Sequence, residues 1–163
     1  MELTDPLDIY AYQLGTVWGR LLSLEMLLRL AISGGNFKDP LDVSVGDEVE
    51  IDAINRWAYM SELVRQYNTI VAGDSPESVL ASGDEIVLLR NALAHGIAIS
   101  TAPAPPLRLV KFGKPSAATG PVTVDFAVDM TSEWLERQQR LVQQAIETVV
   151  SYVKVKGIGQ SHA

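Results

Sequence analysis

The stretch LLRNALAHGI, residues 88–97, decides how the middle of the chain is read. It places His95 five residues after Arg90 in an otherwise apolar run. Leucine and alanine favour a helix here, and Gly96 is a typical residue for ending one. The only other histidine, His162, lies next to the C-terminal residue. We therefore expect His95 to be the histidine that is held in a fixed environment.

Apolar residues at helical spacing on both sides of this stretch predict a mainly α fold. Four main helices are expected, at about 10–33, 53–72, 76–97 and 132–155. Ser75 and Pro76 are a typical cap and first-turn pair for the third helix, which has a weak point at Gly83. The whole chain, residues 1–163, has the length of one domain, and a single domain is expected.

A small β-hairpin is expected before the last helix. The segments LRLVKFGK and GPVTVDFAVD alternate apolar with polar residues, which predicts two strands within about 107–129. Phe112 is expected to pack against the helices, with stacking on a base as the alternative. The acidic segment 36–52 is expected to be a solvated loop with a short strand near 49–51.

Composition limits the chemistry. The chain has no cysteine, which excludes disulfides and thiolate metal sites. We find no motif for a metal, a nucleotide loop or another cofactor, so none is expected. Arg20, Glu25 and Arg29 interrupt the most apolar stretch, so no membrane span is expected. An acidic N-terminus is unlike a signal peptide, and a cytoplasmic protein is expected.

The charge is unevenly distributed. The net charge is −7, which disfavours nucleic acid as a partner. Residues 1–85, however, carry 5 basic and 15 acidic side chains, whereas residues 86–163 carry 8 basic and 5 acidic ones. The half that contains His95 is mildly basic, so RNA stays open as a partner.

Helical geometry decides which side chains can act together. Residues four apart nearly eclipse, whereas residues five apart diverge by about 140°. Asn91 can therefore orient the imidazole of His95, and the same stripe runs back through Leu88 to Asp84. Arg90 projects from a neighbouring face unless the helix ends near Gly96 or a partner chain closes the gap.

These residue types suit the cleavage of RNA without a metal. An imidazole exchanges protons at neutral pH, and a guanidinium binds phosphate. The reaction needs both an acid and a base, and this chain offers one suitable histidine. A two-fold dimer would supply a second His95 and a second Arg90. The alternative is a structural histidine that caps the carbonyl groups of the helix end or completes the core.

The segment RNALAHG, residues 90–96, resembles the R-x4-6-H motif of HEPN domains (higher eukaryotes and prokaryotes nucleotide-binding), in which asparagine commonly follows the arginine. A long first helix with an acidic residue, here Glu25, and a motif on a late helix also resemble that superfamily. The residue two positions after His95 is Ile97 and not the tyrosine of members that a partner enzyme modifies.

The resemblance implies a HEPN-like helical bundle that forms a homodimer with facing motif helices. It implies a metal-independent endoribonuclease, in many members a toxin or a defence protein, in which Arg90 and His95 are catalytic and Asn91 supports them. Glu25 becomes a candidate partner of Arg90 or of a neighbouring residue. Asp84, on the same stripe as Asn91 and His95, is a second supporting candidate. Glu25 needs such a partner because a carboxylate on an apolar stripe is costly unless paired.

Two alternatives remain open beside the nuclease. One is a non-catalytic HEPN module that binds a nucleotide or a protein, and the acidic first half of the chain favours it. The other is a regulatory subunit with an antitoxin-like protein partner. For the nuclease, Arg108, Lys111 and Lys114 of the hairpin are secondary candidates for RNA contacts, although each can also be a plain solvent-facing strand residue.

Overall fold

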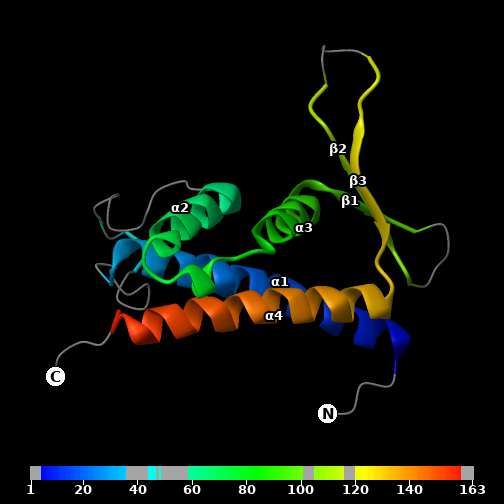
Figure 1. Cartoon of the computed structure of the whole chain (residues 1–163). Helices are drawn as coiled ribbons and strands as arrows, with labels where there is room; N and C mark the ends of the chain where they lie inside the picture. The colour runs from blue at the N-terminus through cyan, green and yellow to red at the C-terminus, as the bar shows by residue number, and fades with distance from the viewer. Residues whose placement is uncertain are drawn as a thin grey trace. The chain divides into compact units, whose positions relative to one another are not determined.

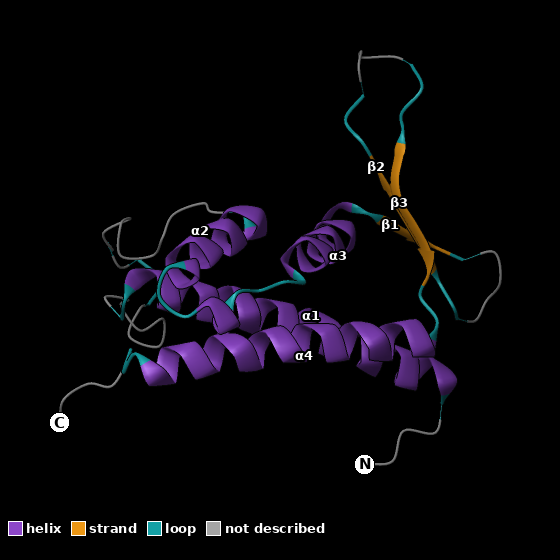
Figure 2. Cartoon of the chain, in the orientation of Figure 1, coloured by secondary structure: helices purple, strands orange, loops and turns teal. Residues whose placement is uncertain are grey.

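The computed structural model describes residues 5–35, 44–46, 48, 59–100, 105–115 and 120–158. The described residues are mainly helical, with a small antiparallel sheet (Figures 1 and 2). In chain order the elements are α1 Pro6–Ser33, α2 Met60–Ala72, the short 3-10 helix η3 Pro76–Ser78, α3 Gly83–His95, β1 Ile97–Ile99, β2 Arg108–Phe112, β3 Val124–Asp129 and α4 Ser132–Val155. The predicted mainly α class is confirmed.

The chain divides into two compact units. The first comprises Met1–Leu21 and Glu85–Val142, and the second comprises Leu22–Asp84 and Gln143–Ala163. The single domain expected over residues 1–163 stays a prediction. The first unit contains Arg90, Asn91, His95 and the sheet, and the second contains α2 and η3.

The helix ends show why these segments are helical. α1 begins at Pro6, four residues before the expected start, because the carboxylate of Asp5 accepts a hydrogen bond from the backbone N–H of Leu7 at 2.7 Å. α4 has the predicted bounds, and the hydroxyl of Thr131 caps it by accepting from the N–H of Trp134. Gly157 follows the end of α4 and has a φ of 64°, a conformation that suits glycine.

The third predicted helix, 76–97, is wrong as a continuous element. Pro76–Ser78 forms only a 3-10 turn, and the hydroxyl of Ser75 makes no capping hydrogen bond. Asn68 of α2 bonds both the N–H and the carbonyl oxygen of Leu80, at 2.9 and 3.3 Å. The backbone N–H and carbonyl of Leu80 are therefore bonded to a side chain and not to other backbone groups of a helix. The regular helix begins at Gly83, where an added Cβ would lie 2.5 Å from Val64 Cγ1.

The segment after α3 also differs from the expectation. Ile97–Ile99 is a strand and not the last turn of a helix, because Gly96 ends the helix and the two β-branched isoleucines pair with β2. The predicted hairpin is present as β2 and β3, and β1 extends it to a three-stranded sheet in the order β1-β2-β3. The start expected for the second helix, at 53, and the strand expected near 49–51 lie outside the described residues.

The second unit is organised around Tyr67, which is fully buried. Its ring meets the ring of Tyr152 edge to face, with centroids 5.7 Å apart. Its hydroxyl donates to the carbonyl oxygen of Ser78 at 3.1 Å. Tyr67 therefore ties α2 both to η3 and to the last turns of α4.

Replacing Tyr67 with phenylalanine should lower the free energy of unfolding by about 1 kcal/mol, because the carbonyl of Ser78 loses its buried donor. Burial raises the pKa of the Tyr67 phenol to about 12, and the nearby Tyr152 acts in the same direction. The unfolded phenol ionises near pH 10, so the wild type should lose stability as the pH rises from about 10 to about 12. Tyr67→Phe should flatten this fall.

Denaturant unfolding at several pH values measures both effects. Tyr12→Phe is the matched control, since Tyr12 is 65% exposed. Equal pH profiles for the wild type and Tyr67→Phe would contradict the assignment.

Candidate functional site

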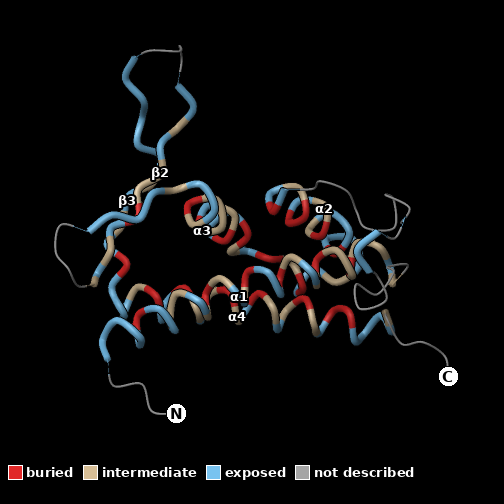
Figure 3. Tube along the Cα trace, turned by 180° about the vertical axis from the view of Figure 1, so that it is seen from behind, coloured by how far each residue is buried: buried red, intermediate tan, exposed pale blue. Residues whose placement is uncertain are grey.

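Helix α3 presents two different faces to its surroundings (Figure 3). Ile86, Leu89 and Ala92 are buried. Leu88 and His95 are exposed, and Asn91 between them is half-buried. The three residues follow one another at spacings of three and four, so they share the outward side of the helix. His95 and Asn91 therefore face away from the core of their own unit.

Arg90 lies on a different side of the same helix. It is half-buried, whereas His95, at the last position of α3, is exposed. Their separation of five residues corresponds to about 140° around the helix axis. Because the backbone is helical from Arg90 to His95, the two side chains leave the helix in different directions. Asn91, four residues before His95, lies on the same side of the helix as His95.

The turn that follows His95 is tightly packed. The N–H of Gly96 donates to the carbonyl oxygen of Ala92 at 2.8 Å, and the chain enters β1 at the next residue. A Cβ on Gly96 would lie 2.8 Å from Leu109 Cδ1 and would also press on the oxygen of Ala92. Glycine is thus required where α3 runs onto β2, and this turn fixes the position of the His95 backbone.

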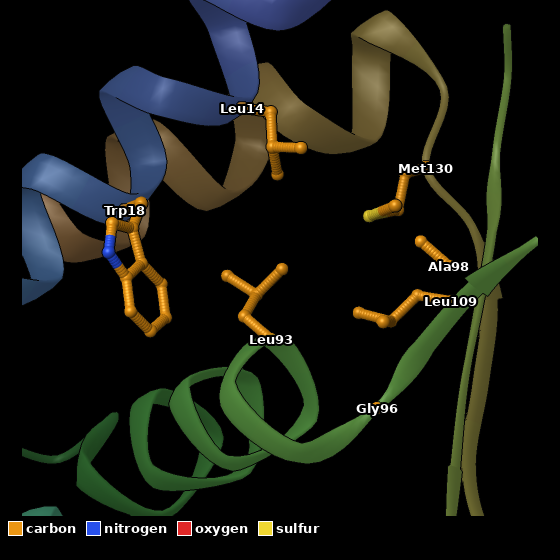
Figure 4. A pocket seen from close by; sticks show the side chains of 7 residues that line it. All are labelled: Leu14, Trp18, Leu93, Gly96, Ala98, Leu109 and Met130. Atoms are coloured by element: carbon orange, nitrogen blue, oxygen red, sulfur yellow. The ribbon is translucent and has the colours of Figure 1, made fainter.

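An apolar cavity of about 230 Å³ lies beneath this turn (Figure 4). Leu93 of α3 points into it, opposite Leu14 and Trp18 of α1. Ala98, Leu109 and Met130 complete the wall together with Gly96. A cavity lined in this way offers no charged group to a phosphate.

The hairpin cations are balanced by carboxylates. Arg108 Nη1 lies 2.7 Å from Asp129 Oδ1, and Lys111 Nζ lies 2.9 Å from Asp125 Oδ2. Lys114 is exposed just beyond β2. Exposed ion pairs contribute only about 0–1 kcal/mol, so a phosphate can compete for these cations. The role of the three residues in RNA binding stays a prediction.

The structure corrects the expectation for Phe112. Its side chain is 46% exposed at the end of β2 and does not lie buried against the helices. The β-bulge between Lys111 and Phe112 shifts the register there, so that Phe112 pairs with Val124. Alternation in the sequence predicted the strand but not the direction in which this ring points.

The two acidic candidates lie in the other compact unit. Glu25 has a basic partner one turn further along α1, where Arg29 Nη2 donates to its carboxylate at 2.9 Å. Asp84 is exposed in the first turn of α3. Arg90, Asn91 and His95 belong to the unit that begins again at Glu85. The supporting roles of Glu25 and Asp84 stay predictions.

Sequence reasoning missed one link between α3 and α4. Arg137 Nη2 lies 3.3 Å from Glu85 Oε1, beside a hollow of about 150 Å³ that Leu88 and Phe126 help to line. Both charged residues are exposed and separated by 52 positions, so no local pattern could have joined them.

Within the described ranges, no three histidine, aspartate or glutamate side chains gather as a metal site would require. None of the helices in those ranges has the length and apolar character needed to cross a membrane. Comparison of the chain with protein-family models, curated proteins and solved structures finds no match.

Gly96→Ala should lower the free energy of unfolding by about 1–3 kcal/mol, because the new methyl group overpacks the turn between α3 and β2. Gly15→Ala on α1 is the control, since an added Cβ meets nothing within 4 Å there. That substitution should stabilise the protein by about 0.5–1 kcal/mol through helix propensity. Denaturant unfolding measures both, and a neutral Gly96→Ala would refute the close packing.

Proposed function

We propose that this chain is a metal-independent endoribonuclease of the HEPN type that acts as a homodimer, in a toxin or defence role. The observation that supports it is the outward position of His95 at the end of α3, with Asn91 on the same side. A histidine that served only the core would be buried. An exposed histidine at the end of α3 is accessible to a second chain and to RNA.

The proposed reaction uses two His95 imidazoles, one from each copy. One takes the proton of the ribose 2′-hydroxyl, and the resulting oxygen attacks the adjacent phosphorus. The bond from phosphorus to the 5′-oxygen breaks, and the second imidazole, which is protonated, gives its proton to that oxygen. The products are a 2′,3′-cyclic phosphate and a free 5′-hydroxyl. Arg90 stabilises the added charge on the phosphoryl oxygens.

The remaining candidates take supporting roles in this proposal. Asn91 hydrogen-bonds the imidazole and fixes its tautomer, since residues four apart on a helix are neighbours. Glu25 and Asp84 stay candidates for supporting roles in this proposal. Arg108 and Lys111 exchange their carboxylate partners for phosphates along the RNA, and Lys114 binds a further phosphate.

A non-catalytic binding module is the second candidate, and the hairpin supports it. Two of its cations are already paired with Asp125 and Asp129, which weakens their attraction for RNA. In this version His95 and Arg90 bind a nucleotide phosphate or an antitoxin-like protein without cutting RNA.

Incubation of the purified chain with total RNA in EDTA tests the nuclease. The wild type should cut, and His95→Ala should reduce the rate by roughly 10²–10⁴-fold, because general acid–base catalysis is lost. His162→Ala is the matched control and should cut like the wild type. Arg90→Ala should also be slow, whereas Arg140→Ala, which removes an exposed arginine of α4, should not.

Circular dichroism must show that each variant is folded. If the folded wild type cuts no faster than His95→Ala, the nuclease proposal fails. Binding of a nucleotide that is lost in His95→Ala would then support the second candidate.

A further inference from the structure

The two faces of the three-stranded sheet follow from its register. Residues directly opposite each other in antiparallel strands point to the same face, and the side alternates along each strand. Ile97 faces Val110, and Val110 faces Ala127. Ile99, Arg108 and Asp129 form the next row on that same face, and Phe112 with Val124 forms a third row. We call these eight residues the outer sheet face.

The opposite face of the sheet covers the core of its unit. Leu109 is only 2% exposed, and it lines the apolar cavity together with Ala98. Phe126 lines the smaller hollow beside α3 and α4. This face is therefore covered by its unit at Leu109 and partly covered at Phe126, Val128 and Lys111.

The outer sheet face is apolar and open to solvent. Ile97 is 55%, Ile99 49% and Val124 51% exposed. Six of its eight residues are apolar, namely Ile97, Ile99, Val110, Phe112, Val124 and Ala127. The solvated face of an antiparallel sheet is commonly polar, and exposed apolar patches mark interaction sites. This face is built like an interface and not like a solvated surface.

We propose that the outer sheet face binds the same face of a second copy of this chain. Its only two charges, Arg108 and Asp129, compensate each other at 2.7 Å. RNA or an anionic membrane would require an excess of cations on this face, and the chain carries a net charge of −7. An identical face brings a matching apolar surface and no uncompensated charge. The Arg108–Asp129 pair then forms part of the polar rim that interfaces have.

The proposed interface would lie near the candidate nuclease site. Its role in catalysis rests on the proposed function, whereas the dimer itself does not. Ile97 follows His95 by two residues, so their Cα atoms lie within about 7 Å. In a two-fold dimer formed through the outer sheet face, His95 of each copy therefore lies at the edge of the interface. The dimer itself can be measured without RNA.

The mass of the full chain in solution tests the interface. Light scattering should give about twice 17.7 kDa for the wild type. Ile99→Glu should give the monomer mass, with dimer dissociation at least tenfold more favourable, because it places two like charges in one apolar contact. Ile70→Glu is the matched control, since Ile70 of α2 is 41% exposed outside the sheet, and it should stay dimeric. Circular dichroism checks that the variants are folded.

Mixing Ile99→Glu with Ile99→Lys tests whether the occupant is an identical face. The mixture should recover the dimer, because opposite charges then meet within one small patch. A monomeric wild type, a dimeric Ile99→Glu, a monomeric Ile70→Glu or a mixture that stays monomeric would each overturn the inference. A dimer without RNA cleavage would refute only the nuclease, and full cleavage by a monomeric Ile99→Glu would refute only the shared site.

Discussion

The close approach of the end of α3 to β2 is the constraint on which the proposed site depends. Gly96 has no room for a side chain between the last helical turn and Leu109. The backbone must therefore leave the helix at His95 and enter a strand within two residues. Because Ile86, Leu89 and Ala92 are buried on the other side of α3, His95 is directed outward at the end of the helix. The same turn places β1 so that its isoleucines lie on the outer sheet face.

Local chemistry in the sequence predicted the parts of the fold that depend on neighbouring residues. α4 has the expected bounds, because Thr131 caps it and Gly157 ends it. The strands β2 and β3 follow from their alternation. The break before α3 could not be predicted beyond a weak point at Gly83, because Asn68, twelve residues before Leu80, holds the intervening backbone.

The candidate site was predictable only as far as one helix determines it. Spacing along α3 placed Asn91 with His95 and turned Arg90 away, and the helix observed over these residues has that geometry. The ion pairs of Arg108 and Lys111 depend on strand register and a β-bulge, which alternation does not specify. The exposure of Phe112 and the open outer sheet face depend on which side of the sheet the helices cover. The sequence of the hairpin alone does not predict which side of the sheet the helices cover.

The central claim is that two copies of His95 act in one site, and mixing wild type with His95→Ala protein tests it most directly. Random exchange of subunits leaves half of the wild-type chains in fully wild-type dimers when the two proteins are equal in amount. RNA cleavage in EDTA, measured per wild-type chain, should therefore fall to about half, and to about a tenth in a ninefold excess of the variant. A cleavage rate per wild-type chain that does not change after subunit exchange would contradict the shared site.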